Sequence, residues 1–398
     1  MFKRDLMPTL LRYAKFPVVA LLGPRQSGKT TLVQNAFPNH KFLSLDDEVI
    51  QVFAQEDPEG FLATHENEHG LILDEFQYAP KLTTYIKLAV DKKKRPGYFV
   101  LTGSQNFLVN KAITESLAGR VGILNLLPLS HNELFENNLA SSDRVSDVIF
   151  TGGYPRIFSD GILPTEFYPS YILSYIQRDV GQLINPTNKS TFRRFVQLCA
   201  GLTGQLCNVS ALAAQAGISS PTAREWLSIM QESYIIFFLE PHLNNFRKRV
   251  TKTPKLYFFD TGLACSLLRI DSPQELAISH FQGALFETFI IADFYKQYCN
   301  LGLRPSLYFW RDMGGAHEID CILDHGMKKY PIEIKAGKNI ASDFFRGLEY
   351  WQKHSDTAPQ DSYLIYGGHE KQIRKYGNVL GWRDMRILIQ ELLSKKTK

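Results

Sequence analysis

One short segment near the N-terminus restricts the possible folds of this chain more than any other. Residues 23–30 read Gly-Pro-Arg-Gln-Ser-Gly-Lys-Thr and fit the pattern G-x-x-x-x-G-K-[ST] at every position. The apolar run Pro17–Leu22 precedes the segment, and a helical pattern, Thr30–Phe37, follows it. A strand, a glycine-rich turn and a helix start in this order surround a phosphate with backbone N–H groups and the positive end of a helix dipole. The segment therefore predicts a nucleotide-binding loop in an α/β domain.

The residues of this loop predict contacts with ATP and Mg²⁺, the two cofactors expected here. Lys29 is expected to reach the β- and γ-phosphates, and the hydroxyl of Thr30 is expected to bind Mg²⁺. A chance match in an ordinary strand–turn–helix is the competing interpretation. The predicted nucleotide-binding residues are Gly23, Pro24, Arg25, Gln26, Ser27, Gly28, Lys29, Thr30 and Thr31.

Another apolar run, Gly70–Leu73, leads directly to two acidic residues, Asp74 and Glu75. The carboxyl ends of parallel strands are where such sheets bind their ligands. Asp74 is therefore expected to hold Mg²⁺, directly or through water. Glu75 is expected to orient and deprotonate the water that attacks ATP. The competing interpretation is that Asp74 caps a helix that starts after the strand.

Two further residues are candidates for catalysis. Ser104 follows the next apolar run and is expected to contact the γ-phosphate or the attacking water, with Gln105 and Asn106 as alternatives. A polar loop that caps the following helix explains the same residues. Arg120 precedes a fifth run, and arginine suits a cation that reaches the γ-phosphate from a partner subunit or a moving lid. That role for Arg120 across an interface requires a homo-oligomer, and a surface salt bridge is the competing interpretation.

Apolar runs alternate with helical patterns over the first third of the chain. Their β-branched and aromatic content is typical of parallel β-α units, so the expected fold class is α/β. The helical character is expected to continue over residues 131–185. The runs are Pro17–Leu22, Lys41–Leu45, Gly70–Leu73, Gly97–Thr102 and Val121–Leu127.

Length and composition limit the domain count, the partners and the compartment. A chain of 398 residues is too long for one core and predicts two or three domains. The formal net charge of +5 permits an acidic partner without requiring one. The five cysteines include no C-x-x-C pair, which favours a reduced, cytoplasmic compartment over a disulfide framework or zinc site. Long apolar stretches are missing from the sequence, so no membrane span is expected.

Several unrelated motifs follow one another along the chain: GPRQSGKTTL at 23–32, LILDEFQYAP at 71–80, LTGSQNF at 101–107, SLAGRVGILNLLPLS at 116–130, GGYPR at 152–156, YIQRDV at 175–180 and KLYFFDTGLA at 255–264. With these motifs the sequence resembles the prokaryotic AAA-type ATPases (AAA_14) that carry a C-terminal DUF4143 domain. The resemblance covers nearly the whole chain. It implies a P-loop NTPase core whose parallel sheet has the strand order 5-1-4-3-2, a small helical lid and a winged-helix segment.

The middle of the chain reads as two helices joined at a glycine. The first helix is expected over Val209–Ser219 with a turn at Gly217, and the second over Ser220–Glu232. A hairpin-like wing after them is expected to grip DNA phosphates. The competing interpretation is that this segment packs against the ATPase core or binds protein. The candidate DNA contacts are Arg247, Lys248, Arg249, Lys252 and Lys255.

A nuclease-like pattern stands near the C-terminus. Asp320 precedes Glu333 by 13 residues, and Glu333 and Lys335 share one face of a strand. With Glu287 from the preceding helix, these carboxylates could hold Mg²⁺ while the lysine stabilises a developing charge. The pattern is similar to the PD-(D/E)-x-K, restriction-endonuclease-like fold, although Ile319 stands where that pattern has proline. A degenerate nuclease fold and an ordinary salt bridge between two strands are the competing interpretations.

These segments predict three domains and leave three functions open. The domains are an ATPase core with a helical lid over 1–180, a winged helix over 181–270 and a nuclease-like α/β domain over 271–398. The first function is an AAA-type protein that hydrolyses ATP and acts on DNA. The second is a nucleotide-gated switch or scaffold that binds a protein partner. The third is a metal-dependent nuclease regulated by ATP.

Overall fold

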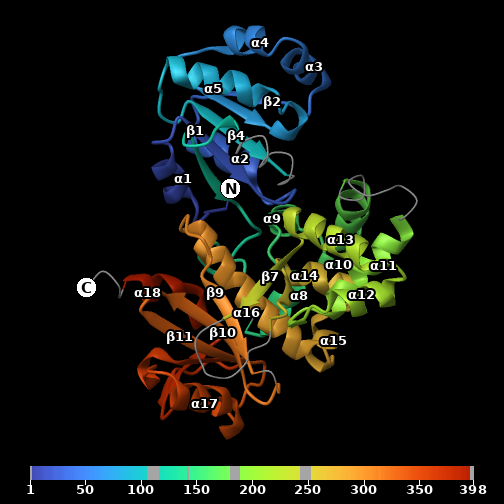
Figure 1. Cartoon of the computed structure of the whole chain (residues 1–398), viewed down its shortest axis with the longest axis vertical. Coiled ribbons are helices and arrows are strands. Elements are labelled where there is room, and N and C mark those ends of the chain that lie inside the picture. The colour runs from blue at the N-terminus through green and yellow to red at the C-terminus, as the bar shows by residue number, and fades with distance from the viewer. Residues whose placement is uncertain are drawn as a thin grey trace. The chain divides into compact units, whose positions relative to one another are not determined.

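The chain forms two compact units in a computed structural model that describes residues 2–104, 116–140, 143–179, 189–242, 252–312 and 314–394 (Figure 1). Unit 1 comprises Met1–Leu129, Glu232–Tyr234 and Cys299–Leu303. Unit 2 comprises Ser130–Gln231, Ile235–Tyr298 and Arg304–Lys398. Each unit has its own β-sheet, of five strands in unit 1 and nine strands in unit 2.

The sheet of unit 1 is entirely parallel and has the order β2-β3-β4-β1-β5. This is the predicted order 5-1-4-3-2 read from the opposite edge, so the prediction is confirmed. The central strands are buried along their whole length, which explains their unbroken apolar runs. The strands are β1 (Val18–Leu22), β2 (Lys41–Ser44), β3 (Leu71–Asp74), β4 (Phe99–Gly103) and β5 (Val121–Asn125).

Helices of unit 1 pack against this sheet. Leu10 of the first helix and Leu32 of the second join Val19 and Leu21 of β1 in one buried apolar cluster. The side chains of Val19 and Leu21 share a face because strand residues alternate in direction. The helical elements are α1 (Met7–Tyr13), α2 (Lys29–Ala36), α3 (Glu48–Glu56), α4 (Pro58–His65), the short 3₁₀ turn η1 (Phe76–Tyr78) and α5 (Leu82–Lys92).

Unit 2 begins with the helical stretch expected over residues 131–185. The described part of that stretch is mostly helical, with short connections between the helices and a π-helix at its end. Its elements are α7 (His131–Glu136), α8 (Val145–Thr151), α9 (Pro155–Ser159), α10 (Pro164–Tyr171) and η2 (Ile172–Asp179). Three further helices pack with them: α11 (Lys189–Gly201), α14 (Thr261–Leu267) and α15 (Pro273–Ile278).

The middle segment contains the two predicted helices, α12 (Val209–Ala216) and α13 (Ser220–Glu232). Gly217 ends α12 in the left-handed region with φ 74°, a conformation that favours glycine. The buried face of α13 carries Trp226, Leu227 and Met230. Three strands accompany these helices: β6 (Gln205–Leu206), β7 (Ile236–Pro241) and β8 (Lys255–Phe258), with β8 antiparallel to both β6 and β7.

The C-terminal segment follows the order helix, three antiparallel strands, helix, parallel strand. These elements are α16 (Gln282–Asn300), β9 (Leu307–Arg311), β10 (Glu318–His325), β11 (Lys328–Lys335), α17 (Arg346–His354) and β12 (Tyr363–Tyr366). The chain continues through β13 (Gln372–Arg374), β14 (Gly377–Gly381) and α18 (Leu388–Ser394). Short 3₁₀ turns, η5 (Ser342–Phe345), η6 (Pro359–Asp361) and η7 (Asp384–Ile387), lie between them.

One sheet runs through both the middle and the C-terminal segments. Its order is β13-β14-β12-β11-β10-β9-β7-β8-β6, and β7 pairs with β9 in parallel. The boundary predicted at residue 270 therefore falls between segments that share hydrogen bonds, and the division into three domains stays a prediction. Among the described helices, none combines the length and apolar character needed to cross a membrane.

Candidate functional site

The loop 23–28 connects β1 to α2 through two glycines that no other residue could replace without strain. Gly23 has φ 153°, and a Cβ atom there would clash with the carbonyl oxygen of Leu126. Gly28 has φ 93° and precedes the first residue of α2. The loop thus leaves the carboxyl end of β1 and enters a helix N-terminus, the setting that binds phosphate.

Lys29 is the first residue of α2, and its side chain turns back into the loop. The ammonium donates to the carbonyl oxygens of Gly23 at 3.0 Å and Pro24 at 2.8 Å. Burial lowers the pKa of Lys29 to about 8, although the nearby carboxylates of Glu75 and Asp74 act in the opposite direction. An anion beside this ammonium would favour its charged form, so the site is suited to phosphate.

Asp74 and Thr30 meet at the carboxyl end of β3. The Thr30 hydroxyl lies 3.1 Å from both carboxylate oxygens of Asp74, and the Thr102 hydroxyl also donates to Asp74. Burial raises the pKa of Asp74, against the effect of the hydrogen bond from Thr102. Hydroxyl and carboxylate oxygens are the donors that Mg²⁺ prefers, so these residues fit the ion. The residue before η1 is Glu75, which makes no capping bond, so the interpretation of Asp74 as a helix cap is wrong.

Glu75 is adjacent to this pair and is held by two polar side chains. Its backbone is left-handed, with φ 53° and ψ 48°, a conformation that costs free energy in a non-glycine residue. The buried Ser104 hydroxyl donates to the Glu75 carboxylate at 3.1 Å. The Gln77 amide donates both to Glu75 and, at 3.3 Å, to Ser104. Ser104 therefore contacts the expected catalytic base, while the alternatives Gln105 and Asn106 lie outside the described residues.

Three residues of this site were not predicted from the sequence: Arg4, Gln77 and Thr102. The buried guanidinium of Arg4 donates to the carbonyl oxygens of Ser27 and Leu127, each at 2.7 Å. No pattern connects Arg4 with residues 23 and 123 positions away. Thr102 could have been found, because β3 and β4 are neighbours and Thr102 ends an apolar run beside Asp74.

Arg120 lies at the amino ends of the strands, whereas the phosphate loop lies at their carboxyl ends. Its backbone oxygen accepts a hydrogen bond from the N–H of Val18 at the start of β1. The five residues of β1 separate the two ends of this strand by roughly 15 Å. The guanidinium pairs with Asp91 at 2.7 Å and 3.0 Å. Arg120 therefore forms the surface salt bridge that competed with the catalytic interpretation. Action at its own phosphate loop is excluded, and action in a second copy of the chain stays a prediction.

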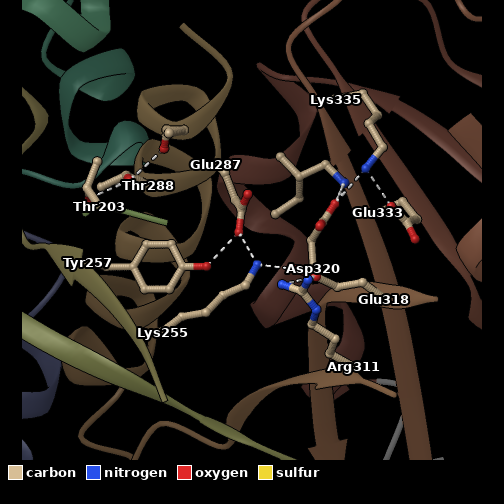
Figure 2. Close-up of polar contacts among 12 residues, drawn as sticks. Thr203, Lys255, Tyr257, Glu287, Thr288, Arg311, Glu318, Asp320, Glu333 and Lys335 are labelled. Atoms are coloured by element: carbon tan, nitrogen blue, oxygen red, sulfur yellow. Dashed lines mark hydrogen bonds and ion pairs between the residues drawn. The ribbon is translucent and has the colours of Figure 1, made fainter. Parts of the chain in front are cut away.

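The structure brings together three of the nuclease-like residues. Asp320 on β10 and Glu333 on β11 lie on adjacent antiparallel strands, and both are buried (Figure 2). The Lys335 ammonium contacts Asp320 at 2.9 Å and Glu333 at 2.7 Å. The backbone N–H of Ile334 donates to the same oxygen of Asp320 at 2.8 Å.

Glu287, the fourth nuclease-like residue, binds other side chains than Asp320, Glu333 and Lys335. Its carboxylate accepts from the Lys255 ammonium at 2.9 Å and from the Tyr257 hydroxyl at 2.6 Å (Figure 2). Lys255 is 3% exposed and also pairs with Glu318. The interpretation of Lys255 as a contact to DNA phosphates is therefore wrong, because strand β8 directs its side chain into the protein. Lys252 is exposed, and Arg247, Lys248 and Arg249 lie outside the described residues.

These contacts determine whether the nuclease-like residues fit Mg²⁺. Within the described ranges, no three His, Cys, Asp or Glu side chains are grouped so that they could hold a metal ion. A lysine ammonium already contacts one carboxylate oxygen of each of Glu287, Asp320 and Glu333. The expected metal centre of Glu287, Asp320, Glu333 and Lys335 is thus not supported by their arrangement.

Comparisons with known proteins agree with the phosphate-loop site. Three family models match successive parts of the chain: an AAA domain (AAA_14) over residues 15–135, a domain of unknown function (DUF8612) over 142–274, and another (DUF4143) over 282–385. The AAA and DUF4143 matches confirm the resemblance inferred from the motifs. The DUF8612 match was not expected.

Solved structures share the fold only distantly. The Walker-type ATPase PABY2304 of Pyrococcus abyssi is 16% identical, with a TM-score of 0.45 over 68% of this chain and 96% of that one. The RuvB Holliday junction branch migration motor of Thermotoga maritima is 19% identical, with a TM-score of 0.31 over 58% of this chain and 86% of that one.

Sequence relatives are closer. The uncharacterized proteins Rv2008c of Mycobacterium tuberculosis and Mb2031c of Mycobacterium bovis are each 30% identical over 337 residues. The match covers 84% of this chain and 74% of each relative. The chain therefore belongs to the same family as these two mycobacterial proteins, and it is an AAA-type P-loop protein in which DUF8612 and DUF4143 domains follow the AAA domain.

Proposed function

We propose that the chain binds ATP with Mg²⁺ in the loop 23–30 and hydrolyses it. One observation carries the proposal: the Thr30 hydroxyl and the Asp74 carboxylate lie 3.1 Å apart, and Glu75 follows Asp74 directly. A magnesium ligand pair and a candidate base therefore stand at the carboxyl edge of the sheet, next to the loop. This edge is where parallel sheets bind ligands.

Each residue has a distinct task in this proposal. Lys29 and the loop N–H groups bind the phosphates, and Thr30 and Asp74 hold Mg²⁺, which neutralises phosphate charge when bound. Glu75 orients the attacking water and accepts its proton. Ser104 and Gln77 restrict the Glu75 carboxylate to one position through the hydrogen bonds described above. Arg4 stabilises the loop by donating a hydrogen bond to the carbonyl oxygen of Ser27.

Measurement of ATP turnover by the purified chain tests this proposal. Lys29→Ala should lower kcat/KM by a factor of about 100 or more, because the main phosphate-binding charge is removed. Gln34→Ala is the matched control, since Gln34 is exposed on the same helix and should leave turnover unchanged. Equal turnover in Lys29→Ala and wild type would contradict the assignment.

A second function, DNA binding coupled to ATP turnover, is supported by the helix pair α12–α13. The turn at Gly217 leaves the start of α13 exposed, with Arg224 at the surface, while its opposite face is buried. An exposed second helix after a glycine turn is the arrangement by which helix-turn-helix proteins approach DNA. A chain that turns over ATP without binding DNA would instead favour the protein-binding switch or scaffold.

A further inference from the structure

A network of charged side chains, in which Lys255, Asp320 and Glu333 are buried, occupies the region where the nuclease-like pattern predicts a metal. We call it the ion network; its members are Lys255, Glu287, Arg311, Glu318, Asp320, Glu333 and Lys335 (Figure 2). They come from strands β8, β9, β10 and β11 and from helix α16. Side chains from five elements thus converge on one cluster inside unit 2.

Lys255 stands at one end of this network. Its ammonium lies 2.9 Å from Glu287 and 2.5 Å from Glu318, so one cation joins two carboxylates. The Tyr257 hydroxyl donates to the same oxygen of Glu287, and Arg311 contacts the second oxygen of Glu318 at 3.4 Å. Oxygen atoms from two different elements surround the ammonium as they would surround a bound cation.

Lys335 has the equivalent position at the other end. Its ammonium joins Asp320 and Glu333 at 2.9 Å and 2.7 Å. Only about a tenth of the Asp320 side chain and a twentieth of the Glu333 side chain are exposed. Water therefore has little access to these carboxylates, and the lysines supply the compensating charge that buried carboxylates require.

The two lysines keep their charge in this setting. Burial alone would lower the pKa of Lys255, but Glu287, Glu318 and Asp320 outweigh it and hold the pKa above its ordinary value. Asp320 and Glu333 have the same effect on the pKa of Lys335. Burial and the nearby charge of Asp320 raise the pKa of Glu333 above its ordinary value, while Lys335 acts in the opposite direction.

We infer that Lys255 and Lys335 act as internal cations in place of a divalent metal, so that the nuclease-like centre does not bind Mg²⁺ and cross-links the strands instead. A metal entering this network would have to displace an ammonium that contacts two carboxylates. At Lys255, whose side chain is 4% exposed, the displaced charge would remain buried nearby. This inference does not depend on the proposed ATPase function. It predicts instead that removal of one ammonium opens a metal site.

Binding of Mn²⁺ to the full chain without nucleotide tests the inference, by isothermal titration or by the electron paramagnetic resonance signal of free Mn²⁺. Wild type and Asp320→Asn should bind the same amount of Mn²⁺.

Lys255→Met removes the ammonium but keeps the length of the side chain, and it should gain about one Mn²⁺ per chain as Glu287 and Glu318 become free to ligate. Adding Glu318→Gln should abolish that gain. Lys328→Met, at an exposed lysine of β11, is the matched control and should gain nothing.

Two results would overturn the inference. The first is Mn²⁺ binding by wild type that disappears in Asp320→Asn or Glu333→Gln. The second is a folded Lys255→Met chain, with a normal circular dichroism spectrum, that gains no Mn²⁺. If Lys255→Met does not fold, the comparison of wild type with Asp320→Asn and Glu333→Gln still decides the question, because it uses the native network.

Discussion

Lys29 and Lys255 are both buried lysines, but their surroundings give them opposite properties. The Lys29 ammonium donates to backbone carbonyl oxygens, which are neutral, so burial dominates and lowers its pKa to about 8. The Lys255 ammonium lies between carboxylates, whose charges hold its pKa above the ordinary value. A bound phosphate would therefore stabilise the charged form of Lys29, whereas the Lys255 ammonium is already neutralised by carboxylates.

The lowered pKa of Lys29 predicts a pH dependence of ATP binding. Above about pH 8 the free protein loses the Lys29 proton, while the complex with ATP retains it because the phosphates favour the charged form. Binding then takes up a proton, so Kd should rise with pH, approaching about tenfold per pH unit well above pH 8. Titration with a fluorescent ATP analogue between pH 7 and pH 9.5 measures this change.

Lys29→Arg is the matched variant for this prediction. An arginine side chain keeps its charge over the whole range, so its Kd should be independent of pH even if its affinity is lower. A wild-type Kd that stays constant from pH 7 to pH 9.5 would contradict the role of the Lys29 ammonium.

At the scale of elements, the helix pair α12–α13 offers the clearest separation of a packing face from an exposed face. Trp226, Leu227 and Met230 are buried, and the Trp226 ring contacts Phe192 and Phe195 of α11 at centroid distances of 5.3 Å. Arg224 lies on the exposed side of α13. The packing of the helix is thus independent of its exposed charge, which can be changed without disturbing the fold.

Reversal of that charge tests the proposed DNA contact. Arg224→Glu should weaken binding to duplex DNA by about tenfold at low salt and reduce the salt dependence of Kd by about one phosphate contact. Fluorescence anisotropy at several salt concentrations measures both quantities, with Glu225→Gln as the neighbouring control. Absence of DNA binding by wild type at low salt would favour the protein-binding switch.

The strands of unit 1 and the acidic strand end could be predicted from the sequence because their signals are local. An apolar run marks each strand, and the parallel arrangement places Asp74 beside the phosphate loop. Arg4 and Lys255 could not be predicted in this way. Arg4 reaches carbonyl oxygens far away in the chain, and Lys255 belongs to a basic stretch that looks exposed until the pairing of β8 with β7 fixes its direction.

In the whole molecule, the charged site of unit 1 and the charged site of unit 2 differ in whether a lysine bridges their carboxylates. The phosphate-loop site of unit 1 collects a lysine, a hydroxyl and two acidic residues at one sheet edge, without an internal cation between Thr30 and Asp74. The ion network of unit 2 has its cations built in. We therefore propose that ATP and Mg²⁺ bind in unit 1 and that the nuclease-like residues of unit 2 stabilise its fold.

We propose that Glu75 activates water for ATP hydrolysis at this loop, and a comparison of wild type with Glu75→Gln separates this role from ATP binding. Binding of Mg²⁺-ATP and its conversion to ADP should be measured on the same samples. Glutamine keeps the size and hydrogen bonding of the side chain but cannot accept the proton. Glu75→Gln should therefore bind ATP with a Kd within about threefold of wild type, while its turnover falls by a factor of about 100 or more. Turnover by Glu75→Gln at the wild-type rate would show that Glu75 is not the base that activates water.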